Sequence, residues 1–300
     1  MARAINGDVE LEYTETGPAD GEPMLLVMGL GAQLTAWRDG FCDLLAESGF
    51  RVIRFDNRDA GLSSKTSARP PGLRELVPLT VPGPRRWEPP YDLSDMAADA
   101  AAVLDAAGVT SAHVVGASLG GMVAQTLAIE HPERVVSLTS IMSKTGAPSS
   151  GLPKPRVLRN VLRPRPEGRD AILANDLARM EMISGPLFER GPAREYIEFA
   201  FDRSYHPDGF AFQTAAMLAS GDRTRALRGL DVPALVIHGR VDPLVGLSGG
   251  EATARAIRGA KLVVHNDMGH DLPRPLWPSL AASITTHARM ASGAPVGSAR

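Results

Sequence analysis

The chain has 300 residues, of which 44% are hydrophobic and 22% are charged, and its formal net charge is -2. This length and composition are typical of a globular protein with one large domain or two ordinary ones. A nucleic-acid-binding protein usually carries a basic excess, so the near-neutral charge argues against that class of partner. The single cysteine, Cys42, excludes an intramolecular disulfide, and its amphipathic helical surroundings predict a buried small side chain.

The N-terminal stretch MARAINGDVELEY lacks the apolar core of a signal peptide. No run of about 18 apolar residues is available to cross a bilayer. We therefore expect a cytoplasmic protein with no membrane span. The final stretch, 291–300, is predicted to be a disordered tail.

The first half of the chain alternates strand patterns with helix patterns. Alternating or continuously apolar runs predict strands at 8–16, 24–28, 51–55, 112–115 and 134–142. Helical patterns lie between them at 36–48, 93–109 and 122–131. Residues 65–92 are rich in proline, arginine and glycine, and we interpret them as a long surface excursion.

The alternation is then interrupted by a helical stretch, residues 146–228, in which no strand is clear. Strands resume at 232–239 and 261–266, with helices at 250–257 and 277–290. Strands alternating with helices predict an α/β fold with a mostly parallel sheet covered on both faces. We expect 1–145 and 229–290 to form this core, and 146–228 to form a helical cap over one end of the sheet.

Two stretches match the pattern G-x-S-x-G, at residues 116–120 and 246–250. The pattern alone is weak, because a chain rich in glycine and serine produces it by chance. Around Ser118 the context fits a nucleophile, since a predicted strand ends, small residues form a sharp turn, and a helix follows. A strained turn of this kind presents the hydroxyl at the end of the sheet, facing the positive end of the next helix.

Ser248 lacks that context, because it follows a loop and not a buried strand. The only free acid between it and a suitable histidine is Asp267, in the same loop as His270. A serine hydroxyl needs a base that is itself oriented by an acid. We therefore interpret Ser248 as a turn or helix N-cap residue and Ser118 as the nucleophile.

The partners of Ser118 should follow it in the order acid and then histidine. His270 lies in the loop NDMGHDLP directly after a predicted strand, at the edge where open α/β sheets bind ligands. Asp242 follows the strand 232–239, whereas the loop after 134–142 contains no acid. We predict His270 as the base and Asp242 as the acid, with an Asp-Pro turn as the alternative interpretation of Asp242.

The order of the triad leaves three other late histidines as candidates. His238 and His265 each end a predicted strand, and either a place at the mouth of the site or a structural role stays open for them. His287 lies in the last predicted helix and is interpreted as a surface residue.

An oxyanion hole needs two backbone N–H groups directed at the developing charge. We predict Leu119, directly after the nucleophile, as one donor and Leu30 as the other. Leu30 lies in the loop MGLGAQ after the strand 24–28, where Gly29 and Gly31 allow the backbone to approach closely.

The motifs GASLGG, VDP and MGH stand in an order and at spacings that resemble the serine-hydrolase branch of the α/β-hydrolase superfamily. More narrowly, GPADGEPMLLVMG, GFRVIRFDNRDAGLSS, YDLSDMAADAAAVLD and HPERVVSLTSIMS are similar to actinobacterial esterases and lipases of the aclacinomycin methylesterase type. The resemblance covers 6–145 and 230–290 well and the expected cap poorly. It implies a mostly parallel eight-stranded sheet with a helical cap inserted after strand six.

The same resemblance implies Ser118 as nucleophile, Asp242 as acid and His270 as base, with no cofactor and no metal. One departure is Met28-Gly29, where many members carry His-Gly. Met28 loses a polar anchor for the loop, but the donated amide is backbone, so the oxyanion hole can persist. The DNRDAG segment resembles the turn that follows strand four in the family, and we interpret its Asp56 and Arg58 as structural.

These features lead to the hypothesis of a serine carboxylesterase that hydrolyses a medium-sized hydrophobic ester through an acyl-enzyme. Candidate substrate-binding residues are Gly29, Met28, Met142, Phe188 and Met217, because ligand pockets are mainly apolar. The nearest resemblance suggests a methyl ester of a polyketide-like acid. The expected partner is a small hydrophobic ester and not a nucleic acid, and a homodimer through an exposed face stays open.

Three alternatives to this hypothesis remain. The same triad would serve a lactone hydrolase, a C–C bond hydrolase or a perhydrolase, because fold and triad do not fix the substrate. A non-catalytic ligand receptor on this fold is disfavoured by the complete Ser/Asp/His set. A nucleic-acid or protein interaction module is disfavoured by that set and by the charge balance.

Overall fold

One sheet forms the centre of the protein in the computed structural model, which describes residues 2–80, 87–161 and 163–293. Over these residues eight strands pair in the order β1-β2-β4-β3-β5-β6-β7-β8. Pairs β1–β2 and β2–β4 are antiparallel and the remaining neighbours are parallel, which confirms the predicted mostly parallel eight-stranded sheet. The strands are β1 Ala2–Asn6, β2 Val9–Thr16, β3 Glu22–Val27, β4 Phe50–Phe55, β5 Ala112–Ala117, β6 Val135–Ile141, β7 Ala234–Gly239 and β8 Lys261–His265.

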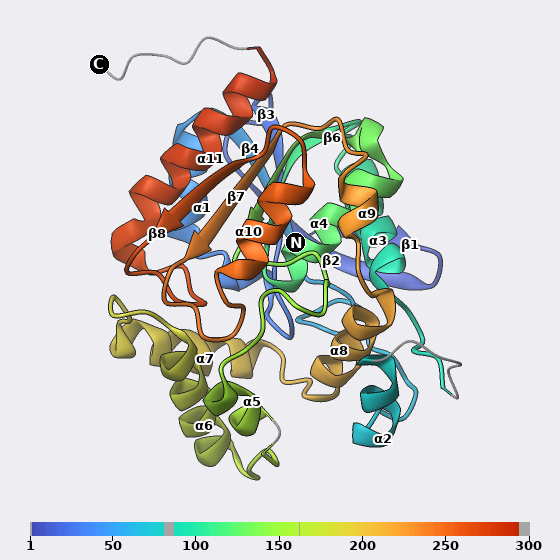
Figure 1. The fold of residues 1–300 in the computed structure, drawn as a ribbon, viewed down its shortest axis with the longest axis vertical. Helices are drawn as coiled ribbons and strands as arrows, with labels where there is room; N and C mark the ends of the chain where they lie inside the picture. Colours follow the sequence, from blue (N-terminus) through green and yellow to red (C-terminus); the bar gives the residue numbers. More distant parts are fainter. Residues whose placement is uncertain (1, 81–86, 162, 294–300) are drawn as a thin grey trace.

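Helices cover both faces of the sheet (Figure 1). One face packs against α1 (Asp39–Glu47) and α11 (Trp277–Ala291), and the other against α3 (Leu93–Ala106), α4 (Leu119–Glu130) and α10 (Ser248–Ala256). The apolar run in strand β3 is explained by burial on both faces of the sheet. Leu25 and Val27 belong to the core under α3 and α4, while Met24 and Leu26 belong to the core under α1 and α11. Successive side chains of a strand point to opposite faces, so a strand buried on both faces needs no polar position.

The helices between β6 and β7 lie mainly beyond one end of the sheet, as α5, α6 and α7 show in Figure 1. Their bounds are α5 Pro155–Val161, α6 Arg169–Ile183, α7 Arg190–Arg203, α8 Asp208–Ser220 and α9 Thr224–Leu227. The described residues of this insertion contain no strand, as the sequence indicated. Helix α8 packs beside the short elements α2 (Leu73–Leu76) and η2 (Val77–Thr80) of the predicted surface excursion. Residues 81–86 of that excursion lie outside the described residues.

Several element boundaries differ from the sequence-based expectations. Strand β1 was not predicted, because it is an edge strand whose side chains are mostly exposed and which therefore has no apolar pattern. The helix expected at 36–48 is divided into η1 (Leu34–Ala36) and α1, and α4 begins at Leu119 instead of residue 122. Helix α11 includes Ala291, which was expected to belong to a tail at 291–300, and residues 294–300 lie outside the described residues.

Candidate active site

Ser118 lies at the turn from β5 into α4, in a backbone conformation that is strained for a serine. Its φ is 55° and its ψ is -118°. The turn requires glycine on both sides. A Cβ on Gly116 would lie 2.1 Å from the carbonyl oxygen of Gly120, and a Cβ on Gly120 would lie 2.1 Å from that of Val27. The G-x-S-x-G pattern at 116–120 is therefore a steric requirement of this strand–turn–helix junction.

Three side chains from three loops form a hydrogen-bonded chain. His270 Nε2 lies 2.9 Å from Ser118 Oγ, and His270 Nδ1 lies 2.7 Å from Asp242 Oδ2. With Nδ1–H donating to the carboxylate, the unprotonated Nε2 can accept the hydroxyl proton of Ser118. These residues follow β5, β7 and β8, whose carboxyl ends meet at one edge of the parallel part of the sheet.

Asp242 is held in place from both sides. Its Oδ1 accepts hydrogen bonds from the backbone N–H groups of Leu244 (2.8 Å) and Val245 (2.9 Å), which leaves Oδ2 for His270. The side chains of Asp242 and His270 are 0% and 8% exposed, so water does not compete for this interaction. A carboxylate that is buried and fully hydrogen-bonded in this way fixes the imidazole tautomer and orientation.

Of the two amides predicted to form the oxyanion hole, Leu119 directly follows Ser118 in the chain and Leu30 directly follows Gly29. Within the described chain, neither the Leu30 N–H nor the Leu119 N–H has a hydrogen-bond partner, so both are free to donate. Gly29 lies close to Ser118, because a Cβ there would lie 3.1 Å from Ser118 Cβ. Ser143 Oγ donates to the Ser118 carbonyl oxygen at 2.7 Å, which supports the turn.

The alternative histidines are separate from this chain of hydrogen bonds. His238 is fully buried behind Asp242, with Nε2 2.8 Å from the Val245 carbonyl oxygen and 3.7 Å from Asp242 Oδ2. Burial lowers the pKa of His238, so the ring is neutral at pH 7 and donates Nε2–H to the carbonyl. His265, at the end of β8, also has a pKa lowered by burial. His287 is buried rather than superficial, contrary to expectation, because the inner side of α11 covers the sheet.

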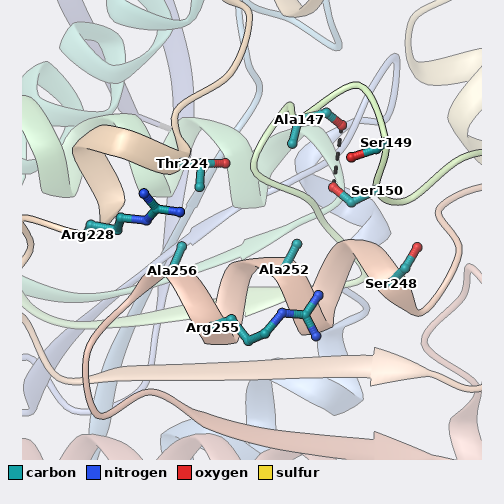
Figure 2. A pocket seen from close by; sticks show the side chains of 9 residues that line it. All are labelled: Ala147, Ser149, Ser150, Thr224, Arg228, Ser248, Ala252, Arg255 and Ala256. Atoms are coloured by element: carbon teal, nitrogen blue, oxygen red, sulfur yellow. Dashed lines mark hydrogen bonds between the residues drawn. The ribbon is translucent and has the colours of Figure 1, made fainter.

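Ser248 belongs to a different part of the molecule. It is the first residue of α10, one position after the N-cap Leu247, and its hydroxyl accepts a hydrogen bond from the Gly151 N–H at 3.0 Å. It lines a cavity of about 350 Å³ between α9, α10 and the loop after β6 (Figure 2). The described residues that line this cavity include no histidine and no carboxylate, so Ser248 has no base there.

Cys42 is fully buried in α1, as predicted. Burial raises the pKa of its thiol to about 11, so the thiolate is scarce at neutral pH. Across the described residues, no three histidine, cysteine, aspartate or glutamate side chains come together in a way that could hold a metal ion. No helix among the described residues is long and apolar enough to span a membrane.

The predicted substrate-binding residues occupy three kinds of place. Gly29 adjoins Ser118, as described above. Met28 and Met142 are only 7% and 5% exposed and pack in the core under α1 and α11. Met217 is partly buried on α8 and packs against the other core, and Phe188 is partly buried just before α7.

The insertion contacts the loop that contains His270 directly, which the sequence did not indicate. The His270 N–H donates to the Ile183 carbonyl oxygen at 2.8 Å. The Asp271 carboxylate accepts from the N–H groups of Gly269 (3.0 Å) and Gly185 (3.3 Å), and burial raises its pKa. Gly185 and Gly269 pack so closely that a Cβ on Gly269 would lie 2.4 Å from the Gly185 nitrogen. Partners about 85 positions apart leave no local pattern by which sequence reasoning could find them.

The asparagine and glutamine that contact the predicted oxyanion loop were also missed. Asn57 Nδ2 donates to the Met28 carbonyl oxygen at 2.8 Å, and Gln213 Oε1 accepts from the Gly31 N–H at 2.7 Å. The nearest signal was the DNRDAG turn, which contains Asn57 beside the expected structural residues. Asp56 is fully buried and accepts from the Leu34 N–H at 2.7 Å, in keeping with that interpretation.

Comparison with known proteins gives consistent matches. The family described as "alpha/beta hydrolase fold" matches residues 22–273. The rhodomycin D methylesterase of Streptomyces peucetius is 30% identical over 96% of this chain and 97% of its own length. A 2-hydroxy-6-oxononadienedioate/2-hydroxy-6-oxononatrienedioate hydrolase of Burkholderia vietnamiensis is 29% identical over 88% of this chain and 85% of its own. The solved structure of a thermophilic esterase from Thermogutta terrifontis has a TM-score of 0.69 and 26% identity, covering 97% of this chain and 99% of that one.

Proposed function

The chain belongs to the α/β-hydrolase family, and from that premise we propose that it is a serine carboxylesterase that works through an acyl-enzyme. The observation that carries the proposal is the continuous contact from Ser118 Oγ to His270 (2.9 Å) and from His270 to Asp242 (2.7 Å). A nucleophile, a base within reach of it and an acid that orients the base are the requirements of covalent ester hydrolysis.

In the first half of the reaction, His270 Nε2 takes the hydroxyl proton as Ser118 Oγ attacks the ester carbonyl carbon. The carbonyl π electrons move to oxygen, and the Leu30 and Leu119 amides stabilise the resulting oxyanion. When the intermediate collapses, the ester C–O bond breaks, and the imidazolium of His270 gives its proton to the leaving alcohol. The buried Asp242 carboxylate stabilises that imidazolium without taking its proton.

In the second half, His270 takes a proton from a water molecule, which attacks the acyl carbon of the Ser118 ester. Collapse of the second tetrahedral intermediate breaks the acyl–Oγ bond, and His270 returns its proton to Ser118. The carboxylic acid leaves, and the triad is restored. Losing one of the two oxyanion donors should slow each half by about 10²–10³.

For the substrate we propose a methyl ester of a medium-sized, hydrophobic, polyketide-like acid. Support comes from the rhodomycin D methylesterase relative, which aligns over 96% of this chain, the insertion included. The helical insertion, which we propose as the cap, supplies Phe188 and Met217 as apolar surfaces for such an acid. Met28 and Met142 remain proposed contacts through the small part of each side chain that is exposed.

We propose a cytoplasmic enzyme whose partner is the small-molecule ester, with no nucleic-acid partner. We also propose a homodimer formed through an exposed face.

C–C bond hydrolysis is the second candidate, and a specific observation favours it. The relative from Burkholderia vietnamiensis is 29% identical over 88% of this chain, and its name gives a 2-hydroxy-6-oxo diacid as the substrate. A diacid of that kind contains no ester bond, so its hydrolysis breaks a carbon–carbon bond. The same triad and oxyanion hole would serve this reaction, as they would serve lactone opening or perhydrolysis.

Rates on substrates of both classes distinguish the two candidate reactions. Purified protein is given p-nitrophenyl esters from acetate to palmitate, an aromatic polyketide methyl ester, and a 2-hydroxy-6-oxo dienoate, each with wild type and with Ser118→Ala. We expect wild-type hydrolysis of the methyl ester and of medium-chain esters, lost in Ser118→Ala. Faster turnover of the dienoate than of every ester would overturn the esterase proposal in favour of the second candidate.

A further inference from the structure

The predicted oxyanion loop, residues 28–33, is fixed from outside as well as by its own turn. The Ala32 N–H donates to the Gly29 carbonyl oxygen at 3.2 Å, which closes a β-turn with Leu30 and Gly31 at its centre. Gly31 has a φ of +67°, a conformation that favours glycine. The turn therefore places the Leu30 N–H and the Gly31 N–H on successive peptide groups with different directions.

The two central N–H groups of this turn differ in whether they already donate a hydrogen bond. The Ala32 N–H is used inside the turn, and the Gly31 N–H donates to Gln213 Oε1 at 2.7 Å. The Leu30 N–H has no partner within the described chain. Leu30 is thus the one central residue of the turn whose amide remains available for an oxyanion.

Gln213 is suited to hold the peptide between Leu30 and Gly31 in one orientation. It lies on α8 of the insertion and is 0% exposed. Its Nε2 donates to the Arg58 carbonyl oxygen at 2.7 Å while its Oε1 accepts from Gly31. Both ends of the amide are therefore bound to backbone groups of opposite polarity, and the side chain cannot flip without losing both hydrogen bonds.

The N-terminal side of the loop has a separate anchor. Asn57, after β4, donates to the Met28 carbonyl oxygen at 2.8 Å. Asn57 and Gln213 thus bracket the Gly29–Leu30 peptide, one from the core and one from the insertion. Without Gln213, the peptide between Leu30 and Gly31 would lose this anchor, and the exposed Gly31 adds little restraint of its own because glycine has no preferred sign of φ.

We propose that Gln213 is a positioning residue for the oxyanion hole, which couples the seating of α8 to the direction of the Leu30 amide. The inference rests on the proposed function, because it concerns the hole that Ser118 would use. A misplacement of about 1 Å at a reacting centre can cost on the order of 10²-fold in rate. Loosening one donor should cost less than removing it, so we expect about a 10- to 100-fold loss.

The test is the rate at which a fluorophosphonate labels Ser118, since this reaction uses the nucleophile and the oxyanion hole but no natural substrate. The variant is Gln213→Met, which keeps the volume and removes both hydrogen bonds. The matched control is Gln125→Met, because Gln125 is equally buried but donates to Ser140 Oγ, at 3.2 Å, away from the loop. Melting temperatures are measured for all three proteins.

We expect Gln213→Met to label about 10- to 100-fold more slowly than wild type and Gln125→Met to label at the wild-type rate. The affinity for an aryl boronic acid, whose adduct places an oxygen in the hole, should fall with the labelling rate in Gln213→Met. KM for a p-nitrophenyl ester should change little while kcat falls. Labelling of Gln213→Met at the wild-type rate would overturn the positioning role and leave the esterase proposal standing. Wild type that is never labelled would overturn the esterase proposal, and the inference with it.

A measurement on the wild type guards against a variant that fails to fold. Gly31 is an exposed residue whose N–H donates to Gln213, so this hydrogen bond should slow the exchange of that N–H with solvent deuterium. We expect protection at Gly31 by residue-resolved hydrogen exchange. Exchange at the rate of an unstructured glycine would overturn the inference without any substitution.

Discussion

Asp242→Asn should inactivate the protein by reversing the tautomer of His270. In the variant, the side-chain carbonyl oxygen is held by the N–H groups that now bind Oδ1, from Leu244 (2.8 Å) and Val245 (2.9 Å). The amide NH₂ must then occupy the position of Oδ2, 2.7 Å from His270 Nδ1. An NH₂ group can only donate, so Nδ1 must accept and Nε2 must carry the proton. An Nε2–H facing Ser118 Oγ cannot take the hydroxyl proton.

The expected loss in kcat is about 10⁴-fold, the size seen when an oriented carboxylate is replaced by an amide with its geometry intact. That factor corresponds to about 5.4 kcal/mol of transition-state stabilisation. The assay is the initial rate on a medium-chain p-nitrophenyl ester, with urea unfolding to verify that the variant is folded. Because the loop hydrogen bonds are kept, the free energy of unfolding should change far less than the activation free energy.

A folded Asp242→Asn protein that keeps kcat within tenfold of wild type would refute this reasoning. Such a result would mean that another group orients His270 or that His270 is not the base. His238 is the nearest alternative, but its Nε2 is already bound to the Val245 carbonyl oxygen.

Three further predictions concern folding and pH. Gly120→Ala should destabilise the protein by about 3 kcal/mol or more, because the added Cβ would lie 2.1 Å from the Val27 carbonyl oxygen. Urea unfolding measures the loss, and a change below about 1 kcal/mol would contradict the packing described. Cys42 should react with a thiol reagent only at the rate of unfolding, since it is fully buried and its pKa is raised to about 11; rapid labelling in native buffer would show that α1 opens. The free energy of unfolding should fall as the pH drops from 7 to 5. Burial lowers the pKa of His238 in the folded state, so below the unfolded-state histidine pKa of about 6.5 the unfolded chain binds more protons than the folded one. Urea titrations at the two pH values test the sign, and His238→Gln should reduce the slope. His265 and His287 shift in the same direction and add to the slope, whereas the raised pKa of Asp271 opposes it.

The fold was predictable because its signals are local. The continuously apolar run at β3 reports burial on both faces, and the small residues around Ser118 report a turn that admits no larger side chain. Strand β1 escaped prediction for the opposite reason. Only Ala4 of its five residues is buried, so pairing with β2 is what makes it a strand.

The candidate site was predictable only in part. Ser118, Asp242 and His270 could be named from chain order and from their places after strands. The side chain that holds the predicted oxyanion loop could not be named, since Gln213 is 182 positions from Gly31 and no local pattern joins the two. Contacts of this kind depend on how the insertion seats on the core, which is a property of tertiary packing and not of sequence periodicity.

We propose that ester hydrolysis proceeds through an acyl-enzyme on Ser118. Trapping that species tests this directly. Wild type and Ser118→Ala are mixed with a p-nitrophenyl ester, quenched in acid within one turnover, and measured by intact-mass and peptide mass spectrometry. We expect a mass increase of one acyl group on the peptide that contains Ser118, and neither adduct nor turnover in Ser118→Ala. An acyl group on a different residue, or hydrolysis that survives in Ser118→Ala, would contradict this proposal.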